Sequence, residues 1–235
     1  MPPLLTSSGY SHSSIAQSVE RVTVNHYVPG SSPGGGVMNS IAFTDKTVYV
    51  TPTKLSDGMI DSIIEYIDSR VEEMQESGID GKTETNFSVR SSTNIWINWD
   101  EWIGGIIHNM MISANREYFH YDLEYFDQPI QAAIYSGDRN DFYTWHTDNG
   151  TSVTAPRRSD GVLIERKLSC SLLLSGPDEY EGGELEFSLG EWNQSKKPSK
   201  GSCVVFPGWL PHRVNPVTSG KRISLVAWMN GPAFK

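Results

Sequence analysis

Short strand-like segments separated by turns are the feature that most limits what this chain can fold into. From residue 130 onward, β-branched and aromatic residues form short runs, and Gly and Pro interrupt them, as at Gly182-Gly183 and Pro207-Gly208. Short strands at such spacing are typical of a β-sandwich or barrel. The predicted strands are residues 130–135, 143–147, 167–174, 184–187, 201–206, 212–215 and 223–229.

Two helices are predicted ahead of these strands. Apolar residues recur at helical spacing from residue 54 to residue 71, with Ser56 and Asp57 as candidate caps, and again from residue 98 or 100 to about residue 119. The predicted fold class is therefore α+β and mainly β. Two N-terminal supporting helices fall within about 54–120, and a β core covers about 129–230.

Residues 1–37 differ from the rest of the chain. They contain one Glu, one Arg and many Ser, and a Pro- and Gly-rich string ends the segment. Residues 15–24 and 31–35 resemble the peptides produced when a tRNA gene is translated, which makes Met38 the natural start. We interpret 1–37 as a disordered or artefactual tail and 38–235 as a single domain.

The composition argues against some functions and indicates the cellular compartment. The net charge of −9 argues against a general nucleic-acid binder, which would be basic. No apolar run reaches the roughly 18 residues that a bilayer span needs, and no signal peptide is recognisable. Cys170 and Cys203 lie in apolar strand-like runs, where reduced and buried thiols are expected. These features predict a cytoplasmic protein with no membrane partner.

His146 and Asp148 form a His-x-Asp step at the end of a predicted strand. Because side chains alternate along a strand, the two project to the same side. Chance alone supplies such a pair in many chains of this size, so the pair needs further support. His212, in a later predicted strand, is the best third partner. Together they would form the two-His, one-carboxylate triad of non-haem Fe(II) oxygenases.

Arg222 opens an otherwise apolar strand. A buried guanidinium is costly without an anionic partner, and its fork suits a carboxylate. Ser224 shares the strand parity of Arg222 and is a candidate second contact. Tyr135, at the end of an earlier strand, carries a phenol that is a further candidate contact to the same carboxylate. Phe142, Tyr143, Trp145 and Trp209 are candidates for the pocket wall.

Several motifs occur together in order between residues 86 and 230. They are Val89-Arg-Ser-Ser92 with Trp96, Tyr135-x-Gly137, His146-x-Asp148, Arg166-x-Leu-Ser-x-Ser-Leu-Leu-Leu-Ser175, Pro177-x-x-Tyr180-x-Gly-Gly-Glu-Leu185 and His212-x-Val-x-Pro-Val-Thr-x-Gly-x-Arg222. This set resembles the 2-oxoglutarate/Fe(II) dioxygenases of the prolyl-4-hydroxylase type, and particularly the bacterial PKHD-type hydroxylases.

The resemblance implies a double-stranded β-helix (jelly-roll) core. It also implies Fe(II) bound by His146, Asp148 and His212, with 2-oxoglutarate bound by Arg222 with help from Tyr135. The expected reaction uses O2 to hydroxylate a substrate C–H bond, such as that of a peptidyl proline or another amino-acid side chain. It is coupled to decarboxylation of 2-oxoglutarate to succinate. L-ascorbate is a candidate additional cofactor.

One position departs from the family pattern. Some prolyl hydroxylases carry a second Tyr that contacts 2-oxoglutarate on the strand that here contains Ser171. Ser171 or Ser169 is a candidate replacement. Arg90 and Trp96 are candidate substrate contacts, and the segment 149–165 is the candidate substrate loop. The substrate, a peptide or a small molecule, is not identified by these residues.

Three other functions remain as alternatives. A nucleic-acid demethylase on the same fold would usually carry a second Arg six residues after the first, where this chain has Trp228. A non-catalytic jelly-roll binding protein would not need the triad and Arg222 together. A zinc hydrolase of the His-Glu-x-x-His type lacks its motif here.

Overall fold

The computed structural model describes residues 47–52, 54–76, 89–126, 128–149 and 159–234. The chain divides into the units Met1–Ile41 and Ala42–Lys235, and all described residues belong to the second unit. The predicted tail, residues 1–37, lies outside the described residues, as does most of the predicted substrate loop 149–165. Within the described part of the chain, no helix is long and apolar enough to cross a membrane.

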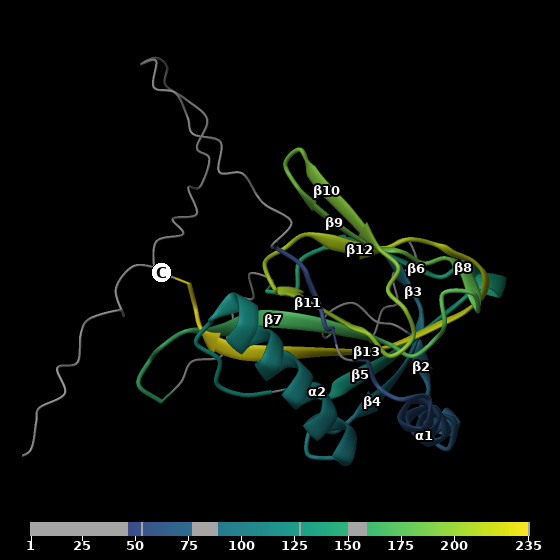
Figure 1. The fold of residues 1–235 in the computed structure, drawn as a ribbon, viewed down its shortest axis with the longest axis horizontal. Coiled ribbons are helices and arrows are strands. Elements are labelled where there is room, and N and C mark those ends of the chain that lie inside the picture. Colours follow the sequence, from purple (N-terminus) through teal and green to yellow (C-terminus); the bar gives the residue numbers. More distant parts are fainter. Residues whose placement is uncertain (1–46, 53, 77–88, 127, 150–158, 235) are drawn as a thin grey trace, which may run out of the picture. The chain divides into compact units, whose positions relative to one another are not determined.

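Two antiparallel sheets make up most of the described structure (Figure 1), which confirms the mainly β prediction. The larger, eight-stranded sheet has the order β1-β11-β7-β13-β5-β4-β2, and β8 pairs with β13. Its strands are β1 (Tyr49–Val50), β2 (Gln75–Glu76), β4 (Thr93–Ile97), β5 (Ile130–Ser136), β7 (Ile164–Leu173), β8 (Tyr180–Gly182), β11 (Cys203–Pro207) and β13 (Val217–Pro232).

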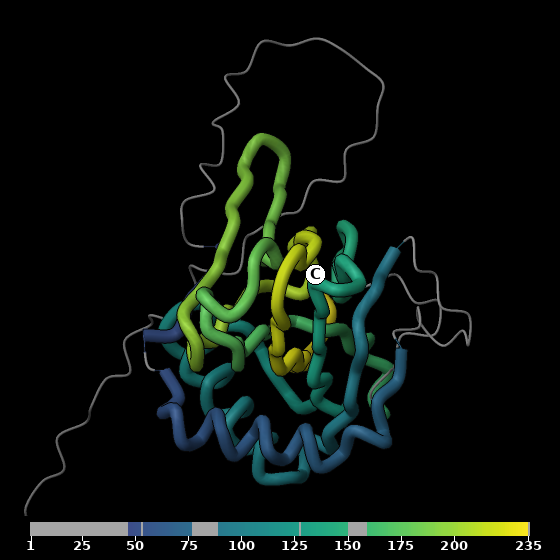
Figure 2. The backbone as a smooth tube through the Cα atoms, turned by 90° about the vertical axis from the view of Figure 1, so that its right-hand side faces the viewer, coloured from purple at the N-terminus to yellow at the C-terminus, as the bar shows by residue number. Residues whose placement is uncertain are grey.

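The smaller, five-stranded sheet has the order β10-β9-β12-β6-β3. Its strands are β3 (Arg90–Ser91), β6 (Phe142–His146), β9 (Leu185–Leu189), β10 (Trp192–Lys196) and β12 (His212–Val214). Its inward residues meet those of the larger sheet in one apolar cluster, which includes Phe187 from β9 and Phe206 from β11. The β9–β10 hairpin projects away from the body of the two sheets (Figures 1 and 2).

The helices α1 (Asp57–Asp68) and α2 (Trp102–Ala114) lie on the other side of the larger sheet (Figure 1). The α1 helix begins at the N-cap Ser56, whose hydroxyl accepts from the Met59 N–H. Isoleucines of both helices, with Met110, Met111 and Ala114, join strand residues in a second apolar cluster. The short helices are η1 (Val71–Glu73), η2 (Asn115–Phe119) and η3 (Gly137–Arg139).

Several boundaries differ from the predicted ones. The first helix ends at Asp68, and Val71 lies in a separate 3-10 turn with 51% of its surface exposed. Strand β13 is much longer than predicted because its first half carries polar residues that hide the apolar pattern. Strands β1, β2, β3 and β8, of two or three residues each, were not predicted because they are too short to show any periodicity.

The two cysteines lie on neighbouring strands of the larger sheet. Cys170 on β7 and Cys203 on β11 are both free and fully buried, as predicted. A hydrogen bond between the two thiols, together with burial, holds the pKa of Cys203 well above its usual range. Cys203 is therefore a neutral thiol that packs beside Cys170 in the core.

Asp141 ties together the strands that lead to the pocket. Its carboxylate is fully buried and accepts from the Ser136 N–H at 2.8 Å, from the Arg139 guanidinium at 2.6 Å and from the Ser91 hydroxyl. Burial alone would raise the pKa of Asp141, but these hydrogen bonds outweigh it and the pKa is lowered. The carboxylate thus joins β3, β5 and the start of β6.

We expect Asp141→Asn to lower the free energy of unfolding by about 2–3 kcal/mol, because charge-assisted hydrogen bonds to a buried group are lost. Urea unfolding at pH 7 measures the loss. The stabilisation is present above the unfolded pKa of about 3.9 and disappears as the pH falls through the lower folded pKa.

The matched control is Asp138→Asn, since Asp138 is exposed on the same turn. Equal destabilisation by the two substitutions would contradict the role given to Asp141.

Candidate active site

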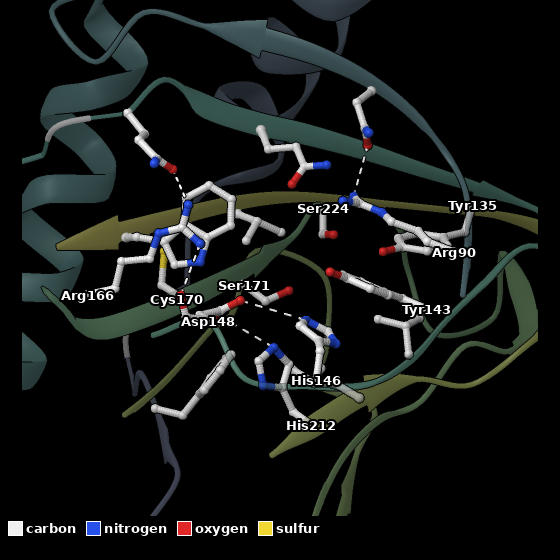
Figure 3. A pocket seen from close by; sticks show the side chains of 18 of the residues that line it. Arg90, Tyr135, Tyr143, His146, Asp148, Arg166, Cys170, Ser171, His212 and Ser224 are labelled. Atoms are coloured by element: carbon white, nitrogen blue, oxygen red, sulfur yellow. Dashed lines mark hydrogen bonds and ion pairs between the residues drawn. The ribbon is translucent and has the colours of Figure 1, made fainter. Parts of the chain in front are cut away.

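A cavity of about 430 Å³ opens between the two sheets, with residues of both in its wall (Figure 3). This volume is typical of sites for small ligands. Predicted site residues from seven strands and from the segment after β6 converge on it. They are Tyr135, His146, Asp148, Ser171, His212, Arg222 and Ser224, together with Arg90 and Trp96.

The structure brings His146, Asp148 and His212 together at one end of this cavity. One ligand atom from each lies within 4.8 Å of the others. The Nε2 atom of His146 is 3.7 Å from one carboxylate oxygen of Asp148, and that of His212 is 3.5 Å from the other. His146 on β6 and His212 on β12 are direct partners in the smaller sheet, so the pairing itself places their imidazoles side by side.

Backbone carbonyls orient both imidazoles. The Nδ1 atom of His146 is 2.8 Å from the Thr144 oxygen, and that of His212 is 2.9 Å from the Leu210 oxygen. A ring nitrogen that donates to a carbonyl carries the proton, so Nε2 keeps its lone pair. Both lone pairs then face Asp148. Two imidazole nitrogens and one carboxylate oxygen in this arrangement fit Fe(II), with further coordination positions left for other ligands.

The electrostatics favour the metal-binding protonation state. Burial, reinforced by the neighbouring His212, lowers the pKa of His146 from 6.5 to about 4. Burial would raise the pKa of Asp148, but His212, His146 and Ser169 lower it. At neutral pH His146 is therefore a neutral imidazole and Asp148 a carboxylate, which are the forms that bind metal.

A bulge in β6 gives His146 its orientation. His212 pairs with His146, but Val214, two residues on, pairs with Tyr143, which is three residues back. The extra residue turns Tyr143 to the same face as His146, and their rings stack with centroids 3.6 Å apart. Trp145 points to the opposite face, where it is 41% exposed.

The wall prediction for the aromatic residues is therefore correct only for Tyr143. Phe142, Trp145 and Trp209 are not among the residues that line this cavity. Strict alternation along β6 does not identify Tyr143 as the inward residue among Phe142, Tyr143 and Trp145, because the bulge changes the register after Tyr143.

Ser169 on β7 is a site residue whose role the sequence did not settle. Its hydroxyl donates to Asp148 Oδ2 at 2.6 Å. Ser169 therefore contacts the proposed metal ligand and not the cosubstrate. Ser171, two residues on, lines the cavity and is the serine left free to replace the missing Tyr. The backbone oxygen of Asp148 accepts from Arg166 at 3.2 Å. Strand β7 thus holds Asp148 at its carboxylate and at its backbone.

Arg222 lies deep in the wall and is 3% exposed. It pairs with Tyr135 across β13 and β5, its guanidinium lies 5.5 Å from the Tyr135 ring centroid, and it donates to Ser224 Oγ at 2.9 Å. Among the described residues no carboxylate lies within 4.0 Å of it, and its Nε has no hydrogen-bond partner. A buried guanidinium is costly without an anionic partner, and Arg222 has none among the described residues.

Tyr180 is a neighbour of Arg222 that sequence reasoning missed. Burial raises the pKa of Tyr180, and the adjacent Arg222 partly offsets the rise. Gly183 makes the approach possible: at φ +65° it has no Cβ, and a Cβ there would lie 3.1 Å from Arg222 Cδ. Gly183 therefore lets the backbone pass close to the Arg222 side chain.

Sequence comparison finds similarity to known oxygenases. Residues 130–230 match the 2OG-Fe(II) oxygenase superfamily. A PKHD-type hydroxylase of Hyphomonas neptunium is 33% identical over 129 residues, which cover 54% of this chain and 54% of that protein. The chain thus spans about half the length of the curated relatives it matches first.

Solved structures show the same fold. A prolyl-4-hydroxylase of Pseudomonas putida has a TM-score of 0.59 at 21% identity, over 80% of this chain and 94% of that one. A prolyl hydroxylase of Trichoplax adhaerens, in complex with a peptide fragment of hypoxia inducible factor, has a TM-score of 0.61 at 16% identity, over 78% of this chain and 83% of that one. These matches confirm the resemblance to 2-oxoglutarate/Fe(II) oxygenases of the prolyl-4-hydroxylase type and the jelly-roll fold.

We expect Ser169→Ala to weaken metal binding by roughly ten-fold or more, because the hydrogen bond that orients Asp148 is lost. Anaerobic titration with Fe(II), or with Mn(II) followed by its magnetic resonance signal, measures the affinity.

Ser171→Ala is the matched control, since Ser171 is on the same strand and in the same cavity but has no bond to Asp148. Unchanged affinity in Ser169→Ala would show that Asp148 is oriented without this serine.

Proposed function

We propose that this protein is an Fe(II)- and 2-oxoglutarate-dependent dioxygenase that hydroxylates a substrate C–H bond. One observation carries the proposal. A buried guanidinium without a carboxylate among the described residues, that of Arg222, lines the same cavity as a two-His, one-carboxylate set. An acid with a carboxylate at one end and a metal-chelating 2-oxo acid at the other matches both features.

His146, Asp148 and His212 are the residues that would hold the iron. Bound Fe(II) would supply the redox chemistry by which O2 and 2-oxoglutarate yield succinate and carbon dioxide while a substrate C–H bond becomes C–OH. The chain contributes two imidazoles, of which that of His146 is neutral at pH 7, and a carboxylate that accepts from Ser169. The rings of Tyr143 and Phe206 pack against these imidazoles. These groups position the reactants and keep competing ones out.

Arg222 would bind the distal carboxylate of 2-oxoglutarate. A guanidinium–carboxylate pair in a buried site is strong because both partners are shielded from water, and the pair supplies the missing anion. Ser224, Tyr135 and Tyr180 surround this end and offer hydroxyl groups. Fixing the far carboxylate orients the 2-oxo acid end toward His146, Asp148 and His212.

The substrate is best sought among amino-acid residues, free or in peptides. Relatives of this chain are named PKHD-type hydroxylases, and the prolyl hydroxylase of Trichoplax adhaerens, which has a similar fold, is in complex with a peptide fragment. Arg90 and Trp96 in the cavity wall are the candidate substrate contacts. A nucleic-acid demethylase is less favoured, because Trp228 fills the position of the second Arg and the chain is acidic.

Two finer predictions belong to this proposal. The helices α1 and α2 would act as supports that cover the outer face of the larger sheet, because their isoleucines are buried against it. L-ascorbate would act as an additional cofactor, and adding it to the activity assay tests the second prediction.

Protein with Fe(II) and 2-oxoglutarate but without O2 is expected to show a visible charge-transfer band. His146→Ala and Asp148→Ala should remove the band because each deletes a metal ligand. His108→Ala is the control, since His108 is exposed on α2. Wild-type protein that binds neither iron nor 2-oxoglutarate would exclude the oxygenase function.

We expect Arg222→Gln to raise the 2-oxoglutarate concentration needed for half-maximal succinate release by roughly 30-fold or more, because one partner of a buried charge pair is lost. Arg222→Lys should restore part of the affinity as a point charge. Arg213→Gln serves as control, because Arg213 is paired with Glu186 and does not line this cavity. An unchanged 2-oxoglutarate requirement would remove Arg222 from the site.

A further inference from the structure

Three arginines line the cavity, and the proposed reaction uses only one of them. Arg222 is assigned to 2-oxoglutarate, which leaves Arg90 and Arg166 (Figure 3). The carboxylates in the wall are those of Asp148, a proposed metal ligand, and Glu76, which is exposed. In Figure 3 the two remaining arginines lie on opposite sides of His146 and Asp148. The part of the cavity left for the substrate is therefore positively charged.

The hydrogen-bond and ring contacts of Arg166 are all to neutral groups, and its charge acts on the Asp148 carboxylate only through space, where it helps to lower the pKa of that group. Its guanidinium lies 4.2 Å from the centroid of the Trp228 ring and donates to the Asp148 backbone oxygen at 3.2 Å and to the Gln128 side-chain oxygen. No acidic side chain of the described residues lies within 4.0 Å of it. A guanidinium has five N–H donors, and these contacts leave several of them for a ligand.

A second Arg–Trp pair in the same chain shows the contrast. Arg213 lies 4.8 Å from the centroid of Trp145 on the outer face of the smaller sheet. Its Nη2 is 2.6 Å from Glu186, so its charge is balanced within the protein. The outer pair is balanced although it is more exposed to water, whereas the pair in the cavity is not. Arg166, which has no ion-pair partner within 4.0 Å among the described residues, thus lies in the wall of the cavity where a ligand would bind.

Arg90 has the same kind of surroundings across the cavity. Its guanidinium lies 4.6 Å from the centroid of Tyr143 and bonds to Ser92 at 3.1 Å and to Asn94 at 3.2 Å. The amide of Gln131, 2% exposed, lies beside the same guanidinium and accepts from it when its oxygen is assigned to the Arg90 side. Neutral amides and hydroxyls fix the geometry of Arg90 without cancelling its charge, and no acidic side chain of the described part of the chain pairs with it.

From these contacts we infer that the substrate carries a carboxylate of its own, which Arg90 and Arg166 bind beside the metal site. The inference rests on the proposed function and narrows its substrate to carboxylate-bearing amino acids or acidic peptides. Arg90 and Arg166 are each held against an aromatic ring and keep some of their N–H donors unused. Two such cations match an anionic group better than a neutral prolyl ring. Stacking on Trp228 and Tyr143 limits the entropy lost when the anion binds.

Paired probes test the inference. One set consists of free amino acids and their amides, and the other of end-capped pentapeptides that contain glutamate or aspartate and their glutamine or asparagine counterparts. Binding is measured by calorimetry to the anaerobic Fe(II)–2-oxoglutarate protein, in which 2-oxoglutarate already occupies Arg222. Substrate-dependent succinate release and mass spectrometry for one added oxygen follow in air.

We expect the best probes to be acids, preferred over their amides by about ten-fold or more. The preference should shrink in Arg166→Gln and in Arg90→Gln and vanish in the double variant. It should persist in Arg166→Lys, which keeps the charge, and in Arg213→Gln. Because Arg166 also bonds to the Asp148 backbone, the variants are compared at equal 2-oxoglutarate occupancy. The two probe sets distinguish a free acid from a peptide side chain.

Two results would overturn the inference: neutral probes that bind as well as acids, or an acid preference that survives in the double variant. Failure of the proposed function gives a different result: the wild-type protein would bind neither 2-oxoglutarate nor Fe(II). The inference about the substrate carboxylate would then be wrong as well.

Discussion

The Arg222 guanidinium, buried without a carboxylate among the described residues, is the constraint on which the rest of the structure depends. Holding such a charge away from water costs several kcal/mol, so the surrounding elements must supply polar contacts and leave room for an anion. Ser224 and Tyr135 on the adjoining strand positions meet the first need, and the cavity that Arg222 lines meets the second. Arg222 in turn requires β13 to be central, where both faces are covered.

The same two-sheet arrangement explains why the metal centre forms on the smaller sheet. His146 and His212 are cross-strand partners on β6 and β12, so antiparallel pairing alone brings their imidazoles together. Asp148 lies just beyond β6 and is held by groups from β7 in the larger sheet. One sheet therefore supplies the imidazoles, while the other fixes the carboxylate and supplies Arg222. Neither sheet alone carries the complete set.

Much of this arrangement could be predicted from the sequence, because it depends on residue type and spacing. The mainly β core, the segments around His146 and His212, and the shared parity of Arg222 and Ser224 all follow from simple periodicity. Other features depend on register between distant strands, which periodicity does not contain. The Ser169–Asp148 bond, the approach of Tyr180 to Arg222 and the outward turn of Trp145 are of this kind. The polar first half of β13 was missed because its residues lie where burial does not select apolar side chains.

The β6 bulge has a consequence for how this protein can change over time. Between Tyr143 and His146 the backbone contains one residue more than its partner strand, and that surplus decides which side of the sheet the imidazole faces. The requirement concerns the length of the segment more than the chemistry of Thr144 and Trp145. Substituting these residues keeps the number of residues in the segment, whereas deleting one would turn every preceding side chain of β6 to the opposite face of the sheet. Evolved variants of this chain should therefore accept substitutions at these two positions but no deletion.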